Sequence, residues 1–90
     1  MENDQISKVA TDLRVFVRDR FKVPDDDPDF NDDVHLFDYG YIDSFGAVEL
    51  TAFVEKAFGA KITERDLVAF PLNTIREIAT FVSRRNAGEI

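Results

Sequence analysis

Residues 40–50 read Gly-Tyr-Ile-Asp-Ser-Phe-Gly-Ala-Val-Glu-Leu, and the organisation of the chain can be worked outward from this stretch. Asp43 and Ser44 stand where a turn-rich segment gives way to a helical pattern that runs to Phe58. Asp43 suits a helix N-cap, and Gly59 is a typical residue just after a helix end, so a helix over 44–58 is predicted. Ser44 would then lie at a helix N-terminus, where free backbone N–H groups and the helix dipole favour a phosphate.

Three more helices are predicted around this one. The first covers about 4–20, because apolar residues recur there at helical spacing, at Ile6, Val9, Leu13, Phe16 and Val17. A capping-box pattern at 63–66 predicts a short third helix to about residue 69, and another at 74–77 predicts a last helix to about residue 85. No strand pattern is evident, so the fold class is all-α.

The helix over 44–58 has two different sides when its residues are placed at helical intervals. The side expected to face the core carries Ala47, Leu50, Val54, Ala57 and Phe58, with Phe53 at its edge. The opposite side, aligned with Ser44, carries a smaller apolar strip flanked mainly by acids, namely Phe45, Val48, Glu49, Ala52 and Glu55. Either this strip lies under a neighbouring loop, or it is a docking surface on which apolar contacts give affinity and acids orient a basic partner.

The connection from Asp25 to Asp43 is long and rich in aspartate. A loop of this length in a small domain is unusual and is often functional. Such a loop could bind calcium, which takes carboxylate ligands, but the EF-hand spacing and its glycine are absent. Solvated loop acids are the preferred interpretation, and no metal site is predicted.

The bulk composition limits the class of protein. Ninety residues predict one domain over 1–90, with an ordered bundle over about 4–85 and a frayed C-terminal tail. The net charge of −7 argues against nucleic acid and anionic membranes as partners. There is no cysteine, no signal-peptide pattern at the acidic start, and no apolar run near the ~20 residues that span a bilayer, so a cytoplasmic location and a monomer are expected.

Ser44 could have one of three roles. A serine near a helix start is usually only a cap. A serine hydrolase is poorly supported, because His35 is the only histidine and no G-x-S-x-G elbow surrounds the serine. The third role is an attachment point for a phosphate-linked group, since an exposed hydroxyl at a helix end is accessible to a transferase.

The extended stretch 40–50 resembles the phosphopantetheine attachment site of acyl carrier proteins, in which Asp-Ser-Leu follows a glycine and precedes an apolar-Glu-Leu pattern. The similarity covers roughly 9–82. It implies a four-helix acyl-carrier-like bundle with a short third helix and a long loop between helices one and two. Phe45 in place of leucine, followed by Gly46, is closer to free-standing specialised acyl or aminoacyl carriers, and Lys56 interrupts the usual acidic face.

The resemblance also implies a function. Ser44 would receive 4′-phosphopantetheine from coenzyme A through a separate phosphopantetheinyl transferase, with Asp43 flanking it for capping and transferase recognition. The thiol of the arm would hold an acyl or aminoacyl group as a thioester, which explains thiol chemistry in a chain without cysteine. An acyl- or aminoacyl-activating ligase and downstream acyl-using enzymes would be the other partners, and the chain would not be an enzyme. The alternative is a non-catalytic acidic helical interaction module without a prosthetic group.

Overall fold

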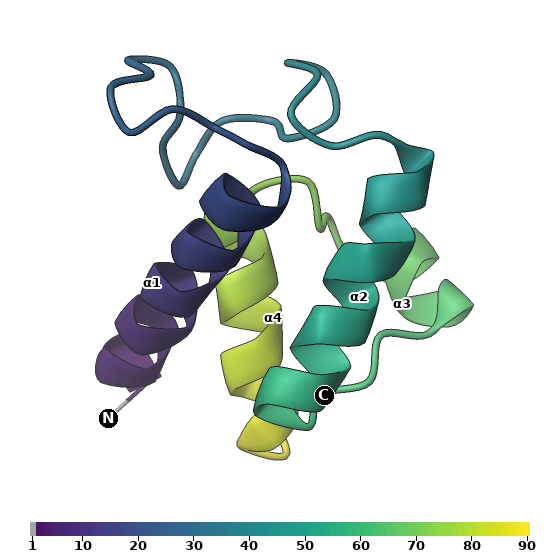
Figure 1. Ribbon diagram of the computed structural model, residues 1–90. Coiled ribbons are helices and arrows are strands. Elements are labelled where there is room, and N and C mark those ends of the chain that lie inside the picture. Colours follow the sequence, from purple (N-terminus) through teal and green to yellow (C-terminus); the bar gives the residue numbers. More distant parts are fainter. Residues whose placement is uncertain (1) are drawn as a thin grey trace.

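The computed structural model describes residues 2–90, with side chains from Asp4 onward, and that part of the chain is all-helical (Figure 1). The elements are α1 (Glu2–Arg20), α2 (Ser44–Phe58), α3 (Glu64–Ala69) and α4 (Ile75–Asn86). No strand occurs between residues 2 and 90. The predicted four-helix bundle, with its short third helix and long first connection, is confirmed.

The three longer helices form the body of the bundle, and α3 lies outside α2 (Figure 1). In the picture α1 runs upward, while α2 and α4 both run downward. Two hydrogen bonds agree with these directions: Ser83 near the end of α4 donates to Gln5 at the start of α1, and Asn86 donates to the carbonyl of Phe58 at the end of α2. The start of α2, which carries Ser44, therefore lies at the same end of the bundle as the long loop.

The core is built from one face of each long helix and from anchors in the loop. In α1 the residues Val9, Leu13 and Val17 are buried while Ile6 and Phe16 pack against them, as the apolar spacing predicted. In α2 the buried side chains are Leu50 and Val54. Ala10 of α1 is buried as well. The remaining buried apolar side chains come from α4 and the connections, including Val23, Phe30, Val34, Leu36, Ile42, Leu72, Ile75, Ile78, Phe81 and Val82.

The helix ends follow local capping chemistry, which is why the sequence located them closely. Gly59 has a positive φ of 70°, the left-handed conformation that ends a helix at low cost in glycine. Thr63 and Thr74 each form a complete capping box, with Asp66 and Glu77 respectively. The structure begins α1 at Glu2, two residues before the expected start, and ends α4 at Asn86, one residue past the expected end.

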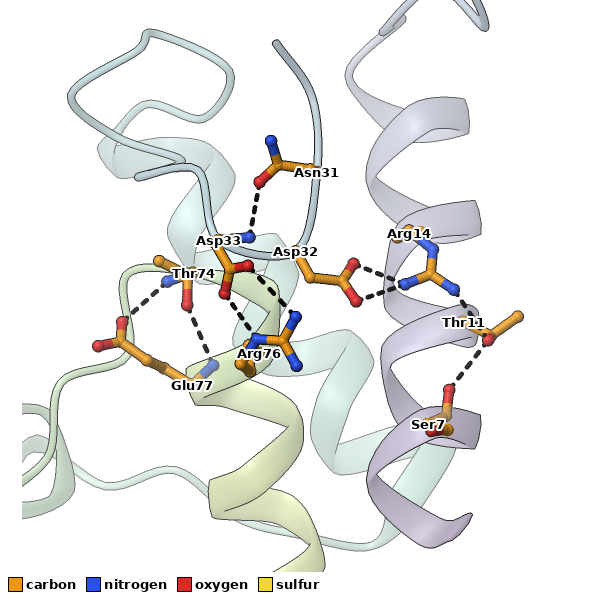
Figure 2. Close-up of polar contacts among 9 residues, drawn as sticks. All are labelled: Ser7, Thr11, Arg14, Asn31, Asp32, Asp33, Thr74, Arg76 and Glu77. Atoms are coloured by element: carbon orange, nitrogen blue, oxygen red, sulfur yellow. Dashed lines mark hydrogen bonds and ion pairs between the residues drawn. The ribbon is translucent and has the colours of Figure 1, made fainter. Parts of the chain in front are cut away.

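The long loop is fastened to two helices by ion pairs, which Figure 2 shows. Asp32 accepts hydrogen bonds of 2.6 Å from Arg14 of α1, and Asp33 accepts one of 2.6 Å from Arg76 of α4. The backbone N–H of Arg76 also donates to the carbonyl of Asp32 at 2.9 Å. Two neighbouring aspartates thus bridge the loop to helices from opposite ends of the sequence. The prediction from sequence that the loop acids are solvated is therefore wrong for Asp32 and Asp33.

After α4 the chain turns back toward the bundle. Glu89 donates its N–H to the carbonyl of Arg84, and Ile90 packs partly buried against the core. The frayed tail expected from the sequence concerns motion and stays a prediction. Of the helices between residues 2 and 90, none combines the length and the apolar character needed to cross a bilayer.

Candidate functional site

Ser44 is the first residue of α2 and is exposed. Asp43 before it is extended, with φ −96° and ψ −176°, and its carboxylate accepts the N–H of Gly46 at 2.7 Å. The N–H groups of Ser44 and Phe45 precede the first intrahelical hydrogen bond and stay available to an anion. Within residues 4–90 the hydroxyl of Ser44 has no hydrogen-bond partner. A free alcohol therefore stands beside unpaired backbone donors.

The turn that delivers Ser44 is fixed by buried side chains on either side of it. Leu36 and Ile42 are 0% and 2% exposed, and the N–H of Ile42 donates to the carbonyl of Leu36 at 3.1 Å. Gly40 between them has a φ of 79°, which a glycine adopts without strain. The segment is tied to the start of α4 by the N–H of Leu36, which donates to the carbonyl of Asn73 at 2.9 Å. The serine is thus held by a loop end that cannot shift without opening the core.

Gly46 is a residue of the site that the sequence pattern did not explain. It is buried, and a Cβ at this position would lie 2.7 Å from Cε1 of Phe21 and 2.9 Å from Cγ2 of Ile42. The aromatic ring that follows α1 therefore packs directly on the backbone of the first turn of α2. A glycine inside an otherwise regular helical pattern was the available signal for such a close approach.

The two sides predicted for α2 are largely as expected. Leu50 and Val54 face the core, but Ala57 is exposed. It lies one residue before the end of α2, where it borders an open hollow between α1, α2 and α4. On the other side Phe45 is 73% and Val48 67% exposed. Ala52 and Glu55 are exposed as well. Within the described part of the chain, residues 2–90, no loop covers this strip, so the interpretation in which a neighbouring loop lies over it is wrong.

Glu49 has an arrangement that the sequence did not suggest. Its carboxylate is half-buried and pairs with the guanidinium of Arg20 at the end of α1. Its charge is therefore partly neutralised from within the protein. Arg20 lies 29 positions away in the sequence, so local spacing gave no signal for this pair.

An apolar cavity of about 140 Å³ lies where α2, α3 and α4 meet. Because Val48 and Leu67 line it and are themselves exposed, the cavity reaches the surface between α2 and α3. Its lining consists of Phe37, Ala47, Val48, Leu50, Thr51, Ile62, Leu67, Leu72 and Ile78. The cavity suits an apolar group rather than a charged one.

His35 makes its polar contacts within the loop that carries it. Nδ1 of His35 accepts the N–H of Asp38 at 3.0 Å, and Nε2 lies 3.7 Å from the Asp38 carboxylate. The imidazole is thus engaged within its own loop. The described residues contain no group of three or more His, Cys, Asp or Glu side chains placed to hold a metal ion.

The comparison with known families identifies this arrangement. The family model described as "Phosphopantetheine attachment site" matches residues 11–82, which is more than half of the chain. The chain belongs to this family. No curated protein and no solved structure matches it.

Family membership supplies the cofactor and the general role. Members carry 4′-phosphopantetheine attached covalently to a serine, so the chain is a phosphopantetheine carrier. The family model spans 72 residues, and within 11–82 the sequence contains one serine, Ser44. Of the other two, Ser7 and Ser83, the second is 2% exposed.

Proposed function

We propose that Ser44 is the residue that bears 4′-phosphopantetheine, and that the chain carries an acyl or aminoacyl group as a thioester on that arm. The observation that carries the proposal is that Ser44 is the one serine inside the matched segment and is also exposed at the start of α2. A transferase would join the Ser44 oxygen to the phosphorus of the phosphopantetheine phosphate of coenzyme A. The P–O bond of the coenzyme A pyrophosphate would break, adenosine 3′,5′-bisphosphate would leave, and the hydroxyl proton of Ser44 would be released. The chain's part in this step is to hold a free alcohol at a fixed turn.

Asp43 and the first turn of α2 support the modified serine. The carboxylate of Asp43 takes the N–H of Gly46, so it caps the helix without covering the hydroxyl. The free N–H groups of residues 44 and 45, at the positive end of the helix dipole, favour the negative charge of the phosphodiester. When bound, the arm supplies a thiol, which the protein itself lacks.

The outer side of α2 is proposed as the surface on which partners dock. Phe45, Val48 and Ala52 offer apolar contact beside Ser44, while Glu49 and Glu55 orient a basic partner. The partners are a phosphopantetheinyl transferase, an acyl- or aminoacyl-activating ligase, and downstream enzymes of a biosynthetic pathway. The chain itself would act as a monomer in the cytoplasm and catalyse none of these steps.

The cavity of about 140 Å³ between α2 and α3 bears on the cargo. Its apolar lining would shelter a short apolar chain and would disfavour a charged ammonium group. This supports an acyl cargo over an aminoacyl one. Engineered protein cavities of about 150 Å³ bind benzene, so a cavity of this size would enclose a short chain and not a long one.

The experiment is a mass measurement on the apo chain, whose unmodified mass is confirmed first. The protein is incubated with coenzyme A, Mg²⁺ and a broad-specificity phosphopantetheinyl transferase. We expect a gain of one phosphopantetheine group, absent in Ser44→Ala and retained in Ser7→Ala, which removes an exposed serine outside the matched segment. No gain in the unchanged chain would favour the alternative, an acidic interaction module without a prosthetic group.

A further inference from the structure

The start of α4 and the residues just before it hold the long loop at two places. At the first, the guanidinium of Arg76 pairs with the carboxylate of Asp33, as Figure 2 shows. The second is the turn that leads to Ser44, where the N–H of Leu36 donates to the carbonyl of Asn73 at 2.9 Å. Because this second contact holds the turn before Ser44, whatever fixes the Asn73 carbonyl also bears on the serine.

The carboxylate of Glu77 fixes the peptide group that carries this carbonyl. Its Oε1 atom accepts the N–H of Asn73 at 2.9 Å and the N–H of Thr74 at 3.1 Å. Figure 2 shows the Glu77 side chain reaching back to Thr74. The carbonyl of Asn73 and the N–H of Thr74 belong to one planar peptide group and point to opposite edges of it. Holding the N–H therefore also sets the direction of the carbonyl that accepts the N–H of Leu36.

From Leu36 the hydrogen bonding continues toward the serine. The carbonyl of Leu36 accepts the N–H of Ile42 at 3.1 Å, and Ile42 directly precedes Asp43, the N-cap of α2. Both Leu36 and Ile42 are buried, so neither can turn away without losing its packing contacts. The series that runs from Glu77 through the peptide group it holds to Leu36 and Ile42 is called the relay. It connects the first turn of α4 to the first turn of α2.

The capping box of α4 divides into two halves that differ in their contact with the loop. In one half the hydroxyl of Thr74 accepts the N–H of Glu77 at 3.1 Å, which supports the helix alone. In the other half the Glu77 carboxylate accepts the N–H of Thr74 and, beyond what the box requires, that of Asn73. The two halves can therefore be removed separately.

We propose that Glu77 is a positioning residue for Ser44. By fixing the peptide group between Asn73 and Thr74, it keeps the turn 36–42 closed and the serine in the conformer that the transferase accepts. This inference rests on the proposed function of Ser44. Without the acceptor, the peptide group rotates, the N–H of Leu36 loses its partner, and the turn opens in part of the population. When only a fraction of a protein is competent, its apparent affinity falls by that fraction, while the step after binding is unchanged.

The test compares Glu77→Ala with Thr74→Ala, which removes the half of the box that does not hold the loop. The apo chains are modified with coenzyme A, Mg²⁺ and a phosphopantetheinyl transferase, and KM for the chain and kcat are measured. We expect Glu77→Ala to raise KM about fivefold with kcat unchanged, which corresponds to a competent fraction of about one fifth. Thr74→Ala should match the unchanged protein in both constants. Glu77→Gln keeps an oxygen that accepts both N–H groups and should restore KM to within about twofold.

Hydrogen exchange of single amides follows the relay without the transferase. The amides of Leu36 and Ile42 should exchange faster in Glu77→Ala than in Thr74→Ala. The amide of Val54, which lies within α2, should exchange alike in the two variants and reports on opening of the whole fold. The comparison remains valid for a variant of lowered stability, because it is made amide by amide.

Each other outcome overturns the inference. If Glu77→Ala and Thr74→Ala raise KM alike, helix capping is the cause, and the proposed function stands as long as the unchanged chain gains its arm on Ser44. A lower kcat at unchanged KM, or a Glu77→Gln variant as impaired as Glu77→Ala, also rejects the positioning role. So does exchange that speeds up equally at the relay amides and within α2. An unchanged chain that is never modified rejects the proposed function and this inference with it.

Discussion

At the scale of single residues, the start of α2 depends on the absence of a side chain at position 46. The ring of Phe21 and the methyl of Ile42 occupy the space in which a Cβ would lie. Phe21 also meets Phe16 edge-to-face, with ring centroids 6.1 Å apart, so the ring is supported from behind. A displaced ring would disturb the junction that holds Ser44.

Gly46→Ala is therefore expected to destabilise the fold even though alanine is the better helix former. Overpacking destabilises a core by about 1–3 kcal/mol, and the higher helix propensity of alanine stabilises the helix by about 1 kcal/mol. We therefore expect a net loss of about 1 kcal/mol in the free energy of unfolding. Urea denaturation measures it. In a Phe21→Ala background the loss should shrink or change sign. An equal loss in both backgrounds would show that the contact with Phe21 is not its cause.

The residues of the site differ in how far the sequence alone predicted them. Ser44, Asp43 and Gly59 were found because capping and helix termination depend on a few neighbouring residues. Helical periodicity placed Phe45 and Val48 on the side of the helix away from the core, but it left open whether a loop covers them; the structure shows both exposed. The pairing of Glu49 with Arg20 did not, because it depends on how α1 and α2 are placed in space.

At the scale of elements, α3 is held by a buried carboxylate, that of Asp66. Asp66 is 6% exposed and accepts hydrogen bonds from Thr63 and, at 2.7 Å, from Arg85. The backbone N–H of Thr63, and then Arg85, lower the pKa of Asp66 below its ordinary value. Arg85 in turn lies over the ring of Phe81, 4.8 Å from its centroid.

Asp66→Ala should therefore loosen α3 and cost stability. Removing one partner of a buried ion pair leaves the other charge unpaired, and we expect a loss of about 3 kcal/mol in the free energy of unfolding. Glu64→Ala changes an exposed acid in the same helix and should cost much less. Urea denaturation compares the two, and hydrogen exchange of the Leu67 amide reports on α3 itself. Equal losses for both variants would contradict a special role for Asp66.

The sequence predicted that the loop is irregular, but it did not predict the ion pairs that fasten it to the helices. Its composition correctly indicated an irregular segment. Which aspartates are structural was not predictable, because Arg14 lies 18 residues and Arg76 43 residues from their partners. An ion pair between distant segments produces no regular spacing in the sequence. Asp32 and Asp33 therefore cannot be distinguished by sequence pattern from the solvated aspartates of the same loop.

At the scale of the whole molecule, one neutral helical body carries one strongly acidic loop. The loop acids that pair with helix cations, Asp32 and Asp33, fasten a segment whose remaining charges repel one another. Tyr41 adds a further tie, because its hydroxyl donates to Asp27 at 3.0 Å. Stability should accordingly depend on pH at both extremes.

On the acid side, the folded protein lowers the pKa of two carboxyls. Arg76 does so for Asp33, and Thr63 with Arg85 does so for Asp66. A lowered pKa contributes stability above the unfolded value of about 3.9 and loses it as pH falls through the folded value. We expect the free energy of unfolding to decline below about pH 4. Asp66→Asn should reduce that decline, and an unchanged acid limb in this variant would contradict the assignment.

On the alkaline side, burial and then the hydrogen bond to Asp27 raise the pKa of Tyr41 above its ordinary value of 10.0. The unfolded chain then loses the phenolic proton first, so the folded state binds more protons and its stability falls as pH rises above about 10. Phenylalanine cannot ionise, so the Tyr41→Phe variant should not lose stability in this way as pH rises. It also lacks the hydrogen bond to Asp27, so it should be less stable than the unchanged protein at neutral pH. Tyr39→Phe alters a 65% exposed phenol in the same loop and is the matched control. Urea denaturation at pH 8 and above pH 10 decides the matter, because equal alkaline losses in the two variants would place the titrating group elsewhere.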